Sequence, residues 1–492
     1  MPTIPFDNSY ANLPDPFYTR LSPTPVAAPA LIAANRELAL QLGIDADWLA
    51  GEAGVQVVAG NVLPEGADPL ASVYAGHQFG SYNPQLGDGR AILLGEVVDA
   101  SGHRFDIQLK GSGPTPYSRG GDGRSPLGPV IREYIVSEAM HNLGVPTTRA
   151  LAAVTTGEQV AREEFLPGAV LARVASSHIR IGTFQFFAAQ KDHEALRLLT
   201  SHTLSRHYPE QQTADNQALA LLQSVIARQA ALVAQWQLLG FIHGVMNTDN
   251  MLLCAETIDY GPCAFMDAFQ ADKVFSSIDH GGRYAYRNQP GIAHWNLACL
   301  AQSLLPLLHD DQEQAVALAQ SAVDTFPDLF LQAHTRGMAK KLGLAEINDQ
   351  DTALVEELFQ LMADNEADFT LTFRRLADLA DQDSGAQPTV KDLLEIPDAL
   401  LPWLTRWRER QQQESNQPGD RQALMYAANP VFIPRNHRVQ EAIAAATTDG
   451  DLQPFHALHA ALATPYNYDP KLARFATPPR REQEVRQTFC GT

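Results

Sequence analysis

The chain has 492 residues, a formal net charge of −20 at pH 7 and 45% hydrophobic residues. That length is enough for about two to four domain-sized units with a sizeable hydrophobic core. The acidic balance disfavours extended contact with nucleic acids or anionic membranes, because such contact needs many Lys and Arg side chains. We therefore expect neither a nucleic acid nor a membrane among the partners.

The four cysteines are too sparse for a disulfide framework, and none has the C-x-x-C spacing of a zinc site. The sequence shows no basic leader followed by an apolar stretch, and no apolar run of about 20 residues. These features predict a cytoplasmic protein.

Residues 1–70 are rich in proline and alanine. An apolar pattern at helical spacing predicts one helix over residues 31–42, which would end at Gly43. We expect this segment to be an N-terminal extension packed on the main body.

Two strands are predicted next, over residues 91–97 and around 105–109. In the second strand Phe105, Ile107 and Leu109 alternate with polar residues. This alternation places Lys110 at the end of the strand, on the face opposite the apolar row.

A glycine-rich run, GSGPTPYSRGGDGRSPLG, follows over residues 111–128. Backbone without Cβ atoms can approach phosphate groups closely, and its N–H groups can point at phosphate oxygens. A plain flexible loop is the alternative interpretation.

Residues 129–143 have the pattern of a helix that begins at Pro129. A Lys at a strand end that pairs with a Glu from the following helix is the arrangement that protein kinases use to hold phosphate. Lys110 has this position, and either Glu133 or Glu138 can be its partner on the sequence alone.

Two further strands are predicted over residues 148–154 and 168–174. Arg173, near the end of the second strand, and Arg180 flank the sequence SSHI. Paired guanidinium groups bind phosphate oxygens bidentately. An ordinary surface ion pair is the alternative for each of these arginines.

A long helix over residues 213–239 leads into the most informative stretch, FIHGVMNTDNMLLCAETIDYG, at 241–261. Its spacing from His243 to Asn250 is that of the kinase catalytic loop, and Asp259-Tyr260-Gly261 is similar to D-F-G. The position of the kinase's catalytic Asp is occupied by Val245, whereas Asp249 directly precedes the metal-type Asn250. The stretch predicts a Mg²⁺–nucleotide site, with a buried structural turn as the alternative.

The remainder is predicted to be helix-rich to residue 410, with helices over 295–308, 313–326, 353–364 and 369–379, and a loop at 381–387. Residues 411–420 are polar and form the best candidate for a linker. The chain ends in FCGT, with Cys490 placed near the terminus.

The chain resembles the SelO/YdiU family, selenoprotein O and its bacterial relatives, along nearly its whole length. The resemblance is carried by YAGHQFG (74–80), LGDGRAILLGE (86–96), FDIQLKGSGPTPYSRGGDGRSPLGP (105–129), FIHGVMNTDNM (241–251), IDYGPCAFMD (258–267) and the terminal FCGT. It implies an α+β, protein-kinase-like two-lobed fold with N-terminal and C-terminal extensions. The expected divisions are an extension over 1–70, a nucleotide-binding small lobe over 71–195, a helical large lobe with the catalytic loop over 196–410, and a C-terminal segment over 411–492.

The family is understood to bind ATP in a reversed orientation and to transfer AMP, with release of pyrophosphate, to Ser, Thr or Tyr hydroxyls of proteins, the enzyme itself included. By that resemblance Asp249 is the catalytic base, and Asn250 and Asp259 bind Mg²⁺, or alternatively Mn²⁺. The residues implied to bind the nucleotide are Gly87, Gly89, Arg90, Lys110 with Glu133, Asp122, Gly123, Arg173, Arg180 and Asp259.

The terminal cysteine of some relatives is proposed to bridge to a cysteine just after the D-Y-G region. The equivalent stretch here, KVFSSI at 273–278, contains no cysteine, so we expect no redox control through such a bridge. Two other functions are kept as alternatives: a kinase-like phosphotransferase, and a non-catalytic nucleotide-binding pseudokinase.

Overall fold

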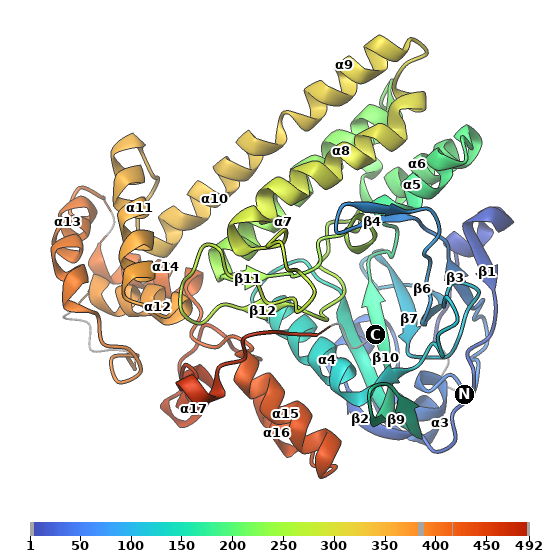
Figure 1. Cartoon of the computed structure of the whole chain (residues 1–492), viewed down its shortest axis with the longest axis horizontal. Coiled ribbons are helices and arrows are strands. Elements are labelled where there is room, and N and C mark those ends of the chain that lie inside the picture. Colours follow the sequence, from blue (N-terminus) through green and yellow to red (C-terminus); the bar gives the residue numbers. More distant parts are fainter. Residues whose placement is uncertain (1–3, 382–387, 416, 490–492) are drawn as a thin grey trace.

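An antiparallel sheet forms one half of the molecule, and long helices extend away from it (Figure 1). The computed structural model describes residues 4–381, 388–415 and 417–489. The strand order in the main sheet is β1-β3-β6-β7-β10-β9-β2, with β8 paired to β10. The strands are β1 (Tyr18–Arg20), β2 (Ala30–Ala34), β3 (Leu70–Ser72), β6 (Ala91–Val98), β7 (Arg104–Lys110), β8 (Ser125–Pro126), β9 (Arg149–Ala161) and β10 (Phe165–Ala175).

The N-terminal segment contributes both edge strands of this sheet. The prediction of one helix over residues 31–42 is wrong for its first part, because Ala30–Ala34 is strand β2 and pairs with β9. Helix α1 (Arg36–Gln41) begins only after Asn35, whose side chain accepts a hydrogen bond from the backbone N–H of Leu38. An asparagine in that position is a strong helix N-cap, and it separates the two elements.

Strand β7 carries an apolar row and a polar row on opposite faces, as its alternation predicted. Ile107 and Leu109 pack against helices α1, α2 (Ala46–Ala50) and α3 (Glu52–Val58). Asp106, Gln108 and Lys110 lie on the other face and are also buried. Buried polar groups need hydrogen-bond partners. We therefore expect the partners of these three side chains among the charged residues packed on this face.

Helix α4 (Leu127–Asn142) packs on that second face. Its predicted apolar residues Ile131, Ile135 and Ala139 are buried against β9, β10 and the C-terminal helices. The helix begins two residues earlier than predicted, with Pro126 as its N-cap. Helices α15 (Asn436–Thr448), α16 (Gln453–Ala461) and α17 (Ala473–Ala476) complete this layer.

The other half of the molecule is helical. Helices α5 (Ile181–Ala189), α6 (His193–His207), α7 (Gln217–Leu239), α8 (Gln289–Leu308), α9 (Gln312–Val323) and α10 (Phe326–Leu342) share one core. Helices α11 (Asp349–Asp364), α12 (Phe369–Ala380), α13 (Leu401–Gln411) and α14 (Pro418–Ala428) form the end farthest from the sheet (Figure 1). The helix predicted over 313–326 is instead the end-to-end pair α9 and α10, and residues 382–387 of the predicted loop lie outside the described part of the chain.

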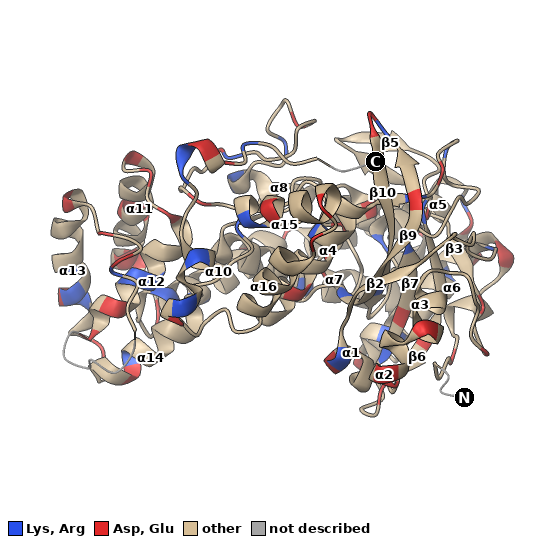
Figure 2. Ribbon diagram, turned by 90° about the horizontal axis from the view of Figure 1, so that it is seen from below, with Lys and Arg blue, Asp and Glu red and all other residues tan. Residues whose placement is uncertain are grey.

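Two small two-stranded sheets lie outside the main sheet. Strands β4 (Gly76–Gln78) and β5 (Ser81–Asn83) form one, and β11 (Phe241–Ile242) and β12 (Ala264–Phe265) form the other. Acidic and basic positions are interspersed along the ribbon in the view of Figure 2. Helix α7 is long and apolar enough to cross a membrane by length and composition, but 61% of its most apolar window is buried inside the protein.

A buried ion cluster ties the C-terminal helices to the core. The Arg435 guanidinium, which is fully buried, lies 2.8 Å from the Asp368 carboxylate and 2.5 Å from that of Asp267. Its Nε also donates to the carbonyl oxygen of Ala476. One arginine therefore neutralises a buried carboxylate, Asp368, and a partly buried one, Asp267, which come from different parts of the chain.

We predict that Arg435→Leu lowers the free energy of unfolding by about 3–5 kcal/mol, because it leaves the buried Asp368 and the partly buried Asp267 without their cation. The measurement is the thermal unfolding midpoint followed by circular dichroism. Arg406→Leu is the matched control, since Arg406 pairs with Glu357 at an exposed position and such pairs contribute little. Equal midpoints for the two variants would contradict the assignment.

Candidate active site

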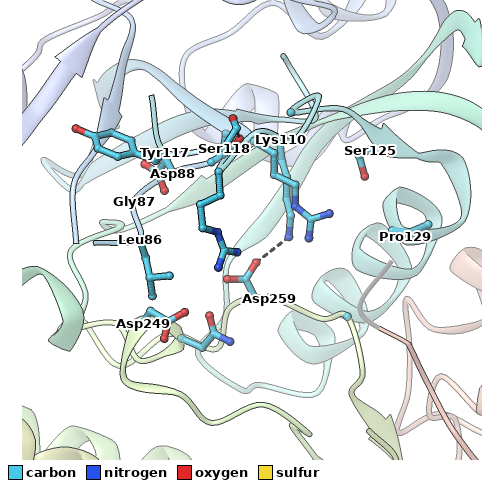
Figure 3. A pocket seen from close by; sticks show the side chains of 18 of the residues that line it. Leu86, Gly87, Asp88, Lys110, Tyr117, Ser118, Ser125, Pro129, Asp249 and Asp259 are labelled. Atoms are coloured by element: carbon cyan, nitrogen blue, oxygen red, sulfur yellow. Dashed lines mark hydrogen bonds and ion pairs between the residues drawn. The ribbon is translucent and has the colours of Figure 1, made fainter. Parts of the chain in front are cut away.

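A cavity of about 850 Å³ lies between the sheet and the catalytic-loop stretch. Figure 3 shows Asp249 and Asp259 on one side, with Lys110, Tyr117 and Ser118 on the opposite side. Of the residues that the sequence pointed to, those lining the cavity are Gly87, Gly89, Arg90, Lys110, Asp122, Gly123, Glu133, Arg173, Arg180, Val245, Asp249, Asn250 and Asp259. Segments far apart in the sequence thus share one cavity.

Local backbone pairing brings the two acidic positions together. Strand β11 pairs with β12, so the chain leaves the hairpin at Ile242 and returns to it at Ala264. His243 is buried, and its Nε2 lies 2.9 Å from the carbonyl oxygen of Ile258. Because this contact closes the base of the loop, residues 243–258 fold back with Asp249 and Asp259 facing the same space.

Lys110 and Glu133 form the ion pair that their order in the sequence predicted. The Lys110 Nζ lies 2.6 Å from the Glu133 Oε2, and Lys110 is only 8% exposed. Glu138, the alternative partner, instead accepts hydrogen bonds from Arg149 at 2.9 and 2.8 Å and from the backbone N–H of Ala150. Glu133 therefore belongs to the cavity, and Glu138 belongs to the junction of α4 with β9.

Asp259 is the common anion of three cationic side chains. Its Oδ1 lies 2.7 Å from Lys110 Nζ and 3.0 Å from Arg173 Nη1, and its Oδ2 lies 3.5 Å from Arg180 Nη1. Burial opposes ionisation of Asp259, but these three cations outweigh it and hold its pKa well below the usual value. The residue has φ of 63°, a left-handed conformation that Asp tolerates better than bulkier residues.

Three residues that the sequence analysis did not single out support the arginines. The Asp88 carboxylate lies 3.4 Å from Arg180 Nη2, and the Tyr74 ring lies below that guanidinium at 4.4 Å. Gln108 accepts a 2.7 Å hydrogen bond from Arg173 and donates one to Asp88. A sequence signal existed only for Asp88, which stands between Gly87 and Gly89.

The glycines of this wall are required by close packing. A Cβ on Gly87 would lie 2.4 Å from the Tyr117 ring, and Gly87 has φ of +94°. A Cβ on Gly123 would lie 2.0 Å from the carbonyl oxygen of Gly113. Asp122 lies at the rim, where its carboxylate pairs with Arg162 at 2.8 Å. The glycine-rich run is therefore a packed wall with a charged rim.

Asp249 is held differently from Asp259. Its Oδ2 accepts a 3.2 Å hydrogen bond from Gln78 Nε2, whereas its Oδ1 is buried without a hydrogen-bond partner among the described residues. Burial raises the pKa of Asp249 to about 6, although Arg180 and Gln78 oppose the shift. The carboxyl group thus combines a buried position, an unshared oxygen and weakened acidity, which is the combination expected of a general base.

Oxygen donors for a metal ion are present at the same place. Asn250 donates its amide nitrogen to the carbonyl oxygen of Val245 at 3.0 Å, which fixes the side chain. Asn250 and Asp259 both line the cavity and supply only oxygen ligands, the type that Mg²⁺ prefers. Asp249, which directly precedes Asn250, lines the same cavity. No group of three or more His, Cys, Asp or Glu side chains suited to a metal occurs within residues 4–381, 388–415 and 417–489.

The three cysteines of the described residues do not line this cavity. Cys254, Cys263 and Cys299 are buried free thiols, and burial raises the pKa of each of them. Thiols of this kind are inert. Cys490 lies outside the described residues.

We predict that Asp259→Asn lowers the thermal unfolding midpoint, because three clustered cations lose their shared carboxylate. Removing one partner of a buried ion pair costs about 3–5 kcal/mol. Added inorganic tripolyphosphate should restore much of the midpoint by replacing the anion. Asp122→Asn is the control, since Asp122 is at the exposed rim. A tripolyphosphate effect of the same size in both variants would refute the arrangement.

Comparison with known proteins gives consistent relatives over the whole chain. Residues 1–463 match the family model described as "Protein adenylyltransferase SelO". The chain is 58% identical to "Protein nucleotidyltransferase YdiU" of Bradyrhizobium diazoefficiens over 489 residues, which cover 99% of each chain. It is 59% identical to a protein of the same description from Methylorubrum extorquens over 494 residues, again 99% of each. For that from Rhizobium meliloti the identity is 57% over 492 residues, with 100% of both chains covered.

Proposed function

The chain belongs to the protein adenylyltransferase SelO family, and we propose that it transfers AMP from ATP to protein hydroxyl groups in the cavity between Asp249 and Asp259. The enzyme is a nucleotidyltransferase whose substrates are ATP and proteins. The observation that carries the assignment of the site is the position of Asp249: a buried carboxylate with one unshared oxygen, in a residue that lines the same cavity as Lys110, Arg173 and Arg180.

The charge of the cavity suits a polyphosphate. A chain of net charge −20 places seven cationic side chains on the lining, namely Arg90, Lys110, Arg119, Arg124, Arg162, Arg173 and Arg180. Cations concentrated in a partly closed site attract anionic ligands strongly, and guanidinium groups bind phosphate oxygens bidentately. We assign Lys110, Arg173 and Arg180 to the β- and γ-phosphates of ATP.

The orientation of the nucleotide follows from which carboxylate is available as the base. An ordinary kinase places its catalytic Asp at the position of Val245, opposite the γ-phosphorus. Val245 lines the cavity here but cannot accept a proton. With the terminal phosphates gripped by the arginines, the α-phosphorus faces Asp249, as in the reversed orientation that the family resemblance implies.

Asp249 then acts as the general base for the acceptor hydroxyl. With a pKa of about 6, it remains mostly ionised at neutral pH while being a better proton acceptor than an exposed Asp. Such a base contributes about 10²–10⁴-fold to the rate. Proton removal lets the hydroxyl oxygen bond to the α-phosphorus as the bond to the pyrophosphate oxygen breaks.

Asn250 and Asp259 are the residues that would hold Mg²⁺, or Mn²⁺ in its place. A divalent ion bound there supplies positive charge that stabilises the reacting phosphates. Asp259 has a second role, because its negative charge offsets the positive charges of Lys110, Arg173 and Arg180. Phosphate oxygens would take over these cations and release the carboxylate toward the metal.

The arrangement supports a protein-kinase-like fold with two lobes. A sheet strand carries Lys110, the following helix carries Glu133, and a loop after a long helix carries Asp249, Asn250 and Asp259. This order matches the parts of a kinase core. We propose the sheet as the small lobe and the helical half as the large lobe.

We predict that ATP labelled at the α-phosphate transfers its label to protein Ser, Thr or Tyr residues, and that γ-labelled ATP does not. Asp249→Asn should reduce transfer at least ~100-fold, the lower bound for a general base, while the affinity for Mg-ATP measured by calorimetry changes little. Transfer of the γ-label would instead identify a phosphotransferase. The absence of any label, with ATP still bound, would identify a non-catalytic nucleotide-binding protein.

We also predict opposite outcomes for the two glutamates of α4. Glu133→Gln should lower kcat/KM for ATP roughly tenfold or more, since Lys110 loses a charge-assisted hydrogen bond. Glu138→Gln should lower the unfolding free energy by about 3 kcal/mol through its contacts with Arg149. Its transfer rate per folded molecule should match wild type. A reversal of these two patterns would contradict the proposed division of roles.

A further inference from the structure

A cluster of aromatic rings and one arginine lies at the surface beside the Asp249 side of the cavity. The Arg283 guanidinium lies 4.8 Å from the centre of the Trp295 ring and 5.8 Å from that of Tyr284. The His77 ring contacts Trp295 at 5.1 Å and Tyr82 at 4.9 Å. Trp295 is 37% exposed and Tyr82 is 41% exposed. We call these five residues the Arg283 cluster.

Arg283 is a cation that the described chain leaves without a carboxylate. No Asp or Glu oxygen of the described residues lies within 4.0 Å of its guanidinium, and its buried Nε has no hydrogen-bond partner there. The nearby Asp279 carboxylate accepts hydrogen bonds from the backbone N–H groups of Arg283 and Tyr284 at 2.9 and 2.8 Å. By contrast, Arg287 pairs with Asp272 at 2.7 Å. The guanidinium of Arg283, which is partly exposed, therefore has no counter-ion among the described residues.

The Arg283 cluster shares a wall with the cavity. The Tyr284 hydroxyl donates a 2.6 Å hydrogen bond to Asn247 Oδ1, and the Phe79 backbone N–H donates to the same oxygen at 3.2 Å. Phe79 and Asn247 line the cavity, and the Phe79 ring lies 5.1 Å from that of Tyr284. A chain segment seated on the cluster would thus reach the Asp249 side of the cavity.

Hydrogen bonds make this wall rigid. The backbone N–H of His77 donates to Thr248 Oγ1 at 2.7 Å, Thr248 donates to Gln185 Oε1 at 2.6 Å, and Gln185 Nε2 lies 2.8 Å from His77 Nδ1. Burial lowers the pKa of His77, so its ring is mostly neutral at pH 7. These hydrogen bonds fix hairpin β4–β5 to Thr248, the residue that precedes Asp249. With His77 mostly neutral, Arg283 carries the positive charge of the cluster.

We propose that Arg283 determines acceptor specificity by binding an acidic side chain close to the hydroxyl residue that receives AMP. The proposal rests on the proposed transfer reaction at Asp249. A guanidinium held on aromatic faces is preorganised and only partly hydrated, so it binds a carboxylate more strongly than a mobile surface cation does. Trp295 and Tyr82 supply apolar contact area for the rest of the acceptor segment.

Charge supports this choice of partner. Most of the surface of a chain with net charge −20 repels acidic segments. Arg283, which has no carboxylate partner among the described residues, therefore distinguishes acidic from basic acceptor segments by attraction at one place and by repulsion around it. A basic segment would be attracted to the acidic surface elsewhere on the protein, but Arg283 would repel it at the mouth of the cavity.

The test uses two synthetic peptides that are identical except for the residues flanking one Ser and one Tyr, with Asp and Glu in the first and Lys in the second. AMP transfer is measured with α-labelled ATP and Mg²⁺ on the full-length enzyme. We expect kcat/KM for the acidic peptide to be at least tenfold higher than for the basic one. In Arg283→Glu this preference should reverse, with the affinity for Mg-ATP unchanged.

The matched control is Arg287→Glu, which makes the same charge change at an exposed, already paired arginine and should keep the wild-type preference. Equal use of both peptides by the wild type overturns the proposal, as does an unchanged preference in Arg283→Glu or self-modification without labelling of either peptide. Failure of the transfer reaction itself is distinguishable, because then the wild-type enzyme carries no α-label on the peptides or on itself.

Discussion

The carboxylate of Asp259, shared among Lys110, Arg173 and Arg180, is the interaction on which the rest of the site depends. These cations come from the sheet and the turn after it, whereas Asp259 comes from the loop of the helical half. Three buried cations repel one another and are costly to desolvate. The protein therefore uses Asp259 as their counter-ion, and we propose that the polyphosphate of ATP takes its place.

The same constraint explains why two neighbouring aspartates have opposite properties. Asp259 has three cations within 3.5 Å, and its pKa is low in spite of burial. Asp249 is more deeply buried than Asp259, its side chain accepts a hydrogen bond from Gln78 alone among the described residues, and its pKa is raised to about 6. One carboxylate is thus fixed as an anion for charge balance, while the other is kept basic enough to receive a proton. Environments that separate two carboxylates in this way are typical of sites that combine binding with acid–base chemistry.

Hairpin β4–β5 shows how a protein acceptor and ATP can meet at Asp249 from different directions. Gln78 from this hairpin contacts Asp249, and a Cβ on Gly76 would lie 2.4 Å from Asp249 Oδ1. The cations that we propose for phosphate binding, Lys110, Arg173 and Arg180, come from different elements, namely β7, β10 and the turn that precedes α5. In the proposed reaction, the hairpin therefore forms the acceptor side of Asp249, and the Arg283 cluster lies next to it.

The sequence by itself determined the catalytic-loop spacing, the loss of the kinase Asp at Val245, and the alternation that places Lys110 on the polar face of its strand. These are local properties, since periodicity and motif spacing are set by residues close together in the chain.

The sequence could not choose between Glu133 and Glu138, which lie on one helix that is buried on nearly all sides. It misassigned residues 31–34 as helix because a short apolar run suits either a helix or a strand, and pairing with β9 made it a strand. It gave no signal for Tyr74 or Gln108, because their roles consist only of contacts with arginines distant in the sequence. Tertiary structure decided these points, since burial and the sharing of charge depend on which distant segments are packed together.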